Sequence, residues 1–186
     1  MAIPAQPESG KGVDPEKVIN SELLDKSMLV VVIMGSDKDL EHAKKIQKRL
    51  NNFGVRCELR VGSAHKNPDY VLPMMHAYDA DTTRQIVYFA VAGRSNALGG
   101  FMGGNTLNPV YSCPPKPDWY DLFSSTRLPS EVPVPVIIEP ESAAMTALRI
   151  FALTRPELHQ RLEAHQDNVL HDLIKADKII SAGNGT

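Results

Sequence analysis

A continuous apolar run near the start of the chain constrains the fold more than any other feature. Residues 29–34 read Leu-Val-Val-Val-Ile-Met, with no polar side chain to face water. Such a run is typical of a strand that is covered on both faces, as in the centre of a parallel sheet. A helical pattern over residues 40–53 follows, and Gly54 is the expected C-cap.

The second predicted strand leads into a turn that carries reactive side chains. Residues 55–61 alternate between apolar and charged, the period of a half-buried strand. We predict a helix over 68–80, capped by Asn67 and kinked or interrupted at Pro73. His65 and Lys66 therefore lie in a strand-to-helix turn. In an open α/β sheet, such turns lie where ligands bind.

Three further strands are predicted, over residues 86–91, 108–112 and 134–138. Between the first two of these, the glycine-rich stretch 92–104 indicates close backbone approach, to a ligand or to a packed helix. The proline-rich residues 113–135 are predicted to be irregular, and a connection of that length is usually functional.

Two helices complete the predicted domain. The first runs over residues 139–151, and its alanines suit tight packing against another helix. The second covers about 156–181 and has a single apolar stripe. That stripe either packs against another subunit or folds back on its own sheet, and the sequence favours neither.

Strands that alternate with helices predict a three-layer α/β/α fold, flavodoxin- or Rossmann-like, with a central parallel sheet of about five strands. Residues 1–27 are rich in Pro, Gly, Ser and charge and are predicted to be a flexible arm. Residues 28–186 form the single predicted domain, including the long C-terminal helix.

Composition excludes several classes of protein. A net charge of −2 and a pI near 6.3 argue against a protein that coats nucleic acid. No apolar run reaches the roughly 20 residues of a membrane span, and the first residues lack the apolar centre of a signal peptide. Cys57 and Cys113 have no CxxC spacing, so we expect reduced thiols in a soluble cytoplasmic protein.

The loop after the first strand, residues 35–39, has two readings. Ser36 and the free N–H groups at a helix start suit a phosphate, and Asp39 could accept hydrogen bonds from ribose hydroxyls. Alternatively, Ser36 or Asp37 is only an N-cap. The spacing is not that of a Walker loop.

Convergence strengthens the case for a site. The carboxyl ends of neighbouring parallel strands bring together Ser36, His65 and the loop of residues 94–96. Histidine is the residue type suited to moving a proton at physiological pH, so His65 could do so, while Lys66 and Arg94 supply positive charge for an anion. These features predict a pocket for a phosphorylated small molecule.

Other chemistries are less well supported. The six histidines form no HxxxH or HxH pair, so no metal site is predicted. Cys113 has no obvious neighbouring base and is expected to be structural.

Several motifs, in this order, resemble those of the phosphoribosylaminoimidazole carboxylases of purine biosynthesis. The resemblance covers residues 29–178 and rests on residues 34–39, 63–69, 92–96, 104–110 and 124–130. Within the family, Lys66 and the sequence Arg94-Ser95-Asn96 resemble class II members, which carboxylate aminoimidazole ribonucleotide (AIR) directly with CO2. Class I members rearrange an N5-carboxy isomer and typically have arginine and a Gly/Ala loop at these positions. Class II members in animals are fused to a second, ligase-type domain, which a chain of 186 residues is too short to contain, so this chain resembles a free-standing version.

The resemblance also implies roles for individual residues. Ser36 and Lys66 would hold the phosphate, Asp39 the ribose, and Arg127 would close over the site. The residues that border the imidazole would be Ser63, Ala64 and His65. The CO2 or carboxylate site would be formed by Ser95, Asn96 and Ala97, where the family often has glycine in place of Ala97.

In the implied reaction, C4 of AIR attacks CO2 and His65 accepts the C4 proton, giving 4-carboxy-AIR (CAIR). This scheme requires neither ATP nor a metal, and CO2 is the only co-substrate. The alternatives are the class I mutase reaction and a non-catalytic nucleotide-binding module. Family members form compact homo-oligomers, so we expect an octamer, with a tetramer as the alternative, and no nucleic-acid or membrane partner.

Overall fold

The structure, a computed structural model, describes residues 25–116 and 118–183. The predicted arm therefore lies mostly outside the described residues. Its last part contacts the body: the Arg155 guanidinium donates to the Asp25 carboxylate at 2.6 Å and to the Ser27 hydroxyl at 2.7 Å.

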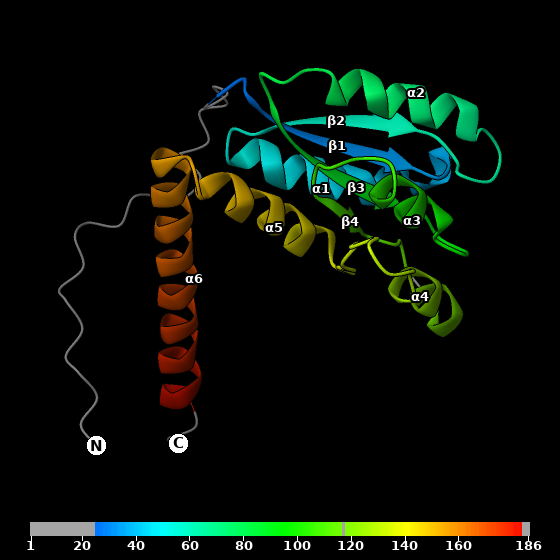
Figure 1. The fold of residues 1–186 in the computed structure, drawn as a ribbon. Helices are drawn as coiled ribbons and strands as arrows, with labels where there is room; N and C mark the ends of the chain where they lie inside the picture. Colours follow the sequence, from blue (N-terminus) through cyan, green and yellow to red (C-terminus); the bar gives the residue numbers. More distant parts are fainter. Residues whose placement is uncertain (1–24, 117, 184–186) are drawn as a thin grey trace.

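A parallel sheet forms the centre of the molecule (Figure 1). Its four strands, in the order β2-β1-β3-β4, are β1 (Met28–Met34), β2 (Arg56–Val61), β3 (Gln85–Val91) and β4 (Val110–Ser112). β1 pairs with β2 on one side and β3 on the other, and every residue of β1 is buried. The apolar run is thus a central strand, as predicted.

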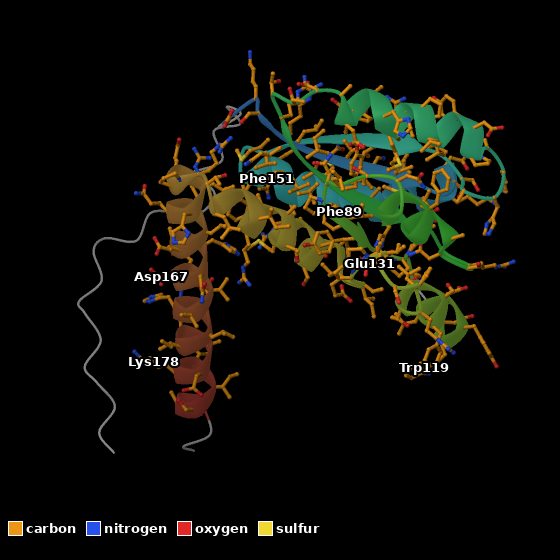
Figure 2. All side chains as sticks on the ribbon, in the orientation of Figure 1. Phe89, Trp119, Glu131, Phe151, Asp167 and Lys178 are labelled. Atoms are coloured by element: carbon orange, nitrogen blue, oxygen red, sulfur yellow. The ribbon has the colours of Figure 1, made fainter. Side chains whose placement is uncertain are left out.

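Helices cover both faces of this sheet, which confirms the three-layer architecture (Figure 1). Helices α1 (Leu40–Asn52) and α5 (Pro140–Ala152) pack on one face, against Val30, Val32 and Phe89. Helices α2 (Pro68–Asp79) and α3 (Ala97–Gly103) pack on the other face, against Val31 and other core residues. Figure 2 shows Phe89 and Phe151 inside the body.

The expected fifth strand is only a single bridge, so the sheet has four strands rather than about five. Val136 bridges Ser112 of β4 in parallel. The Ser112 N–H donates to the Pro135 carbonyl and the Ile137 N–H to the Ser112 carbonyl, each at 2.9 Å. Pro133 and Pro135 have no N–H to donate, which limits the ladder to these two bonds.

Two helices differ from expectation. Pro73 lies inside α2 without interrupting it. Within the segment predicted to be irregular, Trp119–Thr126 forms helix α4, whose N-cap Asp118 accepts a hydrogen bond from the Asp121 N–H at 2.8 Å. The proline-rich composition hid this short helix.

Helix α6 (Pro156–Gly183) projects away from the body (Figure 1). Leu158 is fully buried at its start, and Leu162 packs partly on the core. Beyond these residues the apolar stripe is exposed, so α6 does not fold back on its own sheet. No helix among the described residues is long and apolar enough to cross a membrane.

Candidate active site

Three loops leave the sheet side by side at the carboxyl ends of β2, β1 and β3. Met34, the last residue of β1, is in register with both Val61 and Val91. The Gly62 N–H donates to the Met34 carbonyl at 2.8 Å, and the Gly35 N–H donates to the Val91 carbonyl at 2.9 Å. The parallel register therefore places the starts of these loops together, as ligand sites of open α/β sheets require.

The first loop is closed by a capping box. The Ser36 hydroxyl accepts a hydrogen bond from the Lys38 N–H at 3.2 Å, and the Asp39 carboxylate accepts from the Ser36 N–H at 3.2 Å. Both side chains are half-buried. The capping interpretation of Ser36 is thus correct. The Ser36 hydroxyl also donates a long hydrogen bond to the Asp39 carboxylate at 3.4 Å, and a ligand that accepts from this hydroxyl would have to replace that bond.

The second loop is a tight turn that presents His65 and Lys66 to solvent. The Ser63 N–H donates to the Asn67 side-chain oxygen at 2.8 Å, and the Lys66 N–H donates to the Ser63 hydroxyl at 3.3 Å. His65 and Lys66 are exposed, whereas Ser63 and Ala64 are half-buried. Asn67 thus closes this turn through its side chain, and it makes no side-chain cap to α2.

The third loop presents Arg94 and Ser95 and buries Asn96. Ser95 has a φ of 51°, in the left-handed region that non-glycine residues seldom occupy. The Asn96 side chain caps α3, since its Oδ1 accepts from the Gly99 N–H at 3.1 Å. Arg94 and Ser95 are exposed, Ala97 is half-buried and Asn96 is only 1% exposed.

The glycines beside this loop allow chain segments to pack closely. A Cβ on Gly99 would overlap the Ser112 hydroxyl, and a Cβ on Gly103 would overlap the Val134 side chain. The sequence predicted close approach either to a ligand or to a packed helix. For Gly99 and Gly103, the structure shows the packed helix. Arg127 is the exposed C-cap residue of α4.

Cys113 does have a base beside it, contrary to the sequence-based interpretation. His42 Nε2 lies 3.3 Å from the Cys113 sulfur. This contact could not be predicted from the sequence, because the two residues come from separate elements that only the fold brings together. Burial raises the pKa of the Cys113 thiol to about 12 and, together with Lys45, lowers the pKa of His42. The thiol is therefore protonated at neutral pH, and the structural role of Cys113 stands.

A cavity of about 600 Å³ lies between β2 and α2, away from the predicted site residues. Glu58, Arg60, Tyr70 and Tyr78 are among its lining residues, and none of the predicted site residues is. Tyr78 donates to Glu58 at 2.6 Å, so these polar groups already satisfy one another. No cluster of three or more His, Cys, Asp or Glu side chains that could hold a metal is present in residues 25–116 and 118–183.

Comparison with known proteins defines the class to which this fold and site belong. Residues 29–171 match the AIR carboxylase family. The chain belongs to that family. The match includes every predicted site residue, and it confirms the resemblance read from the motifs.

Curated relatives bear the corresponding enzyme names. A phosphoribosylaminoimidazole carboxylase from Archaeoglobus fulgidus is 40% identical over 82% of this chain and 85% of its own length. A human bifunctional phosphoribosylaminoimidazole carboxylase/phosphoribosylaminoimidazole succinocarboxamide synthetase is 47% identical over 88% of this chain. This chain spans only 40% of the human protein's length.

A solved structure supports the same assignment. The crystal structure of Treponema denticola PurE superposes with a TM-score of 0.78 and 37% sequence identity, covering 81% of this chain and 97% of that one. The fold of the described residues is therefore that of the family.

Proposed function

We propose that this chain is a phosphoribosylaminoimidazole carboxylase that converts AIR and CO2 reversibly into CAIR in purine biosynthesis, without ATP. The observation that carries the proposal is the exposed pair His65 and Lys66. The pair lies on a turn that starts beside the loops after β1 and β3. A proton-transfer group and a cation stand together there, at the sheet edge where ligands bind.

The phosphate and ribose contacts of AIR are proposed for the first two loops. Ser36 and Lys66 would hold the phosphate, and the Asp39 carboxylate would accept from a ribose hydroxyl. Ser63, Ala64 and His65 would border the imidazole. The exposure of Lys66 supports its part, because an ammonium at the surface can meet a dianion without first breaking an ion pair.

The CO2 or carboxylate end of the ligand is proposed for the third loop. The exposed Ser95 hydroxyl and Arg94 guanidinium suit an anionic product, whereas the Asn96 side chain is already hydrogen-bonded. Asn96 and Ala97 would therefore help to form the carboxylate site through their backbone rather than through their side chains. Arg127, at the end of α4, would close over the site.

The chemistry needs one proton acceptor. The AIR amino group donates electrons into the ring, so that C4 attacks the CO2 carbon and one C=O electron pair moves to oxygen as a carboxylate forms. The C4 proton then passes to His65, and the ring regains its aromaticity. In reverse, His65 returns the proton to C4 as CO2 leaves. Because CO2 is already electrophilic, the protein mainly orients and desolvates it, and the scheme calls for no cofactor.

Lys66 and the sequence Arg94-Ser95-Asn96 favour direct carboxylation over the mutase reaction of class I. The test is the forward reaction with AIR, bicarbonate and carbonic anhydrase but no ATP, run in parallel with the N5-carboxy isomer. Turnover of AIR that increases with dissolved CO2 is expected. Turnover of the N5 isomer alone would make the chain a mutase, and binding of AIR without either reaction would make it a non-catalytic module.

The exposed stripe of α6 supports a homo-oligomer, for which an octamer is proposed and a tetramer is the alternative. Its apolar residues are between 44% and 65% exposed, and they are Val169, Leu170, Leu173, Ile174, Ile179 and Ile180. A row of this kind along one helix indicates a protein partner, and a second copy of the chain is the simplest one. A cytoplasmic location remains a prediction.

A further inference from the structure

Helix α4 holds the third loop through three hydrogen bonds that the sequence did not suggest. The Asn96 N–H donates to the Ser124 hydroxyl at 2.9 Å, and the Asn96 side-chain amide donates to the Ser125 hydroxyl at 3.0 Å. The Ser95 N–H donates to the Asp121 carboxylate at 3.3 Å. Consecutive loop residues are thus bound to one face of a helix more than 20 positions later in the chain.

The buried amide of Asn96 is hydrogen-bonded at both its oxygen and its nitrogen. Its oxygen accepts from Gly99, its nitrogen donates to Ser125, and both Asn96 and Ser125 are 1% exposed. The Ser125 hydroxyl in turn donates to the Asp121 carbonyl at 3.2 Å. Without Ser125 the Asn96 amide would lose its partner where water cannot easily replace it, which is costly for a buried donor.

The backbone of Ser95 explains why the loop needs such support. A serine at a φ of 51° is strained, and a strained residue persists only where its surroundings fix it. The bonds from Ser95 to Asp121 and from Asn96 to Ser124 fix the peptide groups on either side of the Ser95 side chain. They therefore determine the direction in which its exposed hydroxyl points.

We propose that Ser124 and Ser125 are positioning residues for the carboxylate end of the ligand. They touch neither AIR nor CO2. They hold Asn96, and through it the Ser95 hydroxyl and the start of α3, in the conformation that receives the carboxylate. This inference rests on the proposed function, and it assigns to α4 a specific part in it.

The test compares Ser125→Ala with wild type and with Thr126→Ala. Thr126 is exposed on the same helix, and its hydroxyl bonds only within that helix, to the Phe123 carbonyl, so it controls for damage to α4 itself. Ser125→Ala is expected to raise the KM for CO2, or lower the rate of CAIR decarboxylation, by about ten-fold, as loss of one buried hydrogen bond implies. The affinity for AIR, measured by titration calorimetry without CO2, should stay within about two-fold, since the phosphate and ribose contacts lie on the other loops.

Equal losses of AIR affinity and of turnover in Ser125→Ala would overturn the inference, as would unchanged kinetics. If Ser125→Ala does not fold, half-buried Ser124→Ala supplies the same comparison, because its hydroxyl accepts only from the loop backbone and donates to the Asp121 carbonyl. A wild-type chain that neither binds nor carboxylates AIR would instead overturn the proposed function. The two failures are therefore distinguishable.

Discussion

The residues proposed to bind AIR combine structural bonds with exposed reactive groups. Ser36 caps its helix, Ser63 closes its turn and Asn96 caps α3, whereas His65 and Lys66 are exposed at the end of a turn. Side chains of the first kind set the shape of a loop, and those of the second kind can meet a ligand. Substitutions of His65 or Lys66 are therefore expected to change ligand binding or turnover with little change in the stability of the fold.

Lys66→Ala should weaken the binding of AIR about ten- to a hundred-fold, since a hydrogen bond to a charged group contributes about 1.5–3 kcal/mol. Titration calorimetry measures the dissociation constant. Lys48→Ala, which removes an exposed lysine from α1, is the matched control and should bind normally. An unchanged affinity in Lys66→Ala would remove this residue from the phosphate site.

His42 should make the stability of the fold depend on pH. Burial, and then the charge of Lys45, lowers its pKa, against the opposing effect of the Asp39, Glu139 and Glu141 carboxylates. The unfolded chain therefore takes up a proton near pH 6.5 while the folded chain does not. Stability is complete above that pH and decreases as the pH falls through the window down to the folded pKa.

Thermal melting at pH 7.5 and 5.5 tests this prediction. His42→Gln should lose less stability than wild type between these two pH values. Some dependence will remain, because burial and Arg49 also lower the pKa of His165. An identical loss in the variant and wild type would mean that His42 does not contribute.

At the scale of elements, the sequence predicted best those helices and strands whose pattern of apolar residues is set by a single neighbouring surface. The buried strand β1 and the amphipathic helix α1 could be predicted because their patterns reflect a single neighbouring surface. The short helix α4 could not, because long-range bonds from Ser124 and Ser125 to the third loop hold it. The Cys113–His42 contact and the reduced fifth strand likewise depend on segments far apart in the chain.

Gly103→Ala should destabilise the protein by about 1–2 kcal/mol. The added methyl group would overlap Val134, and overpacking costs about 1–3 kcal/mol, partly offset by the better helix propensity of alanine. Chemical denaturation measures the difference. The control is Gly183→Ala at the end of α6, where a Cβ has no neighbour within 4 Å. If both variants were equally stable, the packing of α3 against Val134 would not matter.

At the scale of the whole molecule, α6 and α4 lie at opposite ends of the body. Figure 2 shows Asp167 and Lys178 on the projecting α6 and Trp119 on α4. Trp119, Tyr120 and Phe123 are exposed, as is the stripe of α6. Two apolar surfaces on one small domain fit a chain that assembles with copies of itself.

Light scattering should therefore give a mass several times the 20.4 kDa of one chain at micromolar concentration. The double variant Leu173→Asp/Ile174→Asp should shift the mass towards the monomer, because it puts charge into the apolar stripe. Lys175→Ala is the control, because it changes an exposed residue beside the same two positions without adding charge to the apolar stripe. A monomeric wild type would contradict the assembly.

The most direct test of the account is the decarboxylation of CAIR in D2O, with wild type and His65→Asn compared. Wild type should release CO2 and form AIR that carries deuterium at C4, without ATP. His65→Asn should bind AIR as wild type does but decarboxylate CAIR about 10²- to 10⁴-fold more slowly, the usual contribution of a general acid or base. Comparable rates in the two proteins would show that His65 does not transfer the proton, and no CO2 release from wild type would contradict direct carboxylation itself.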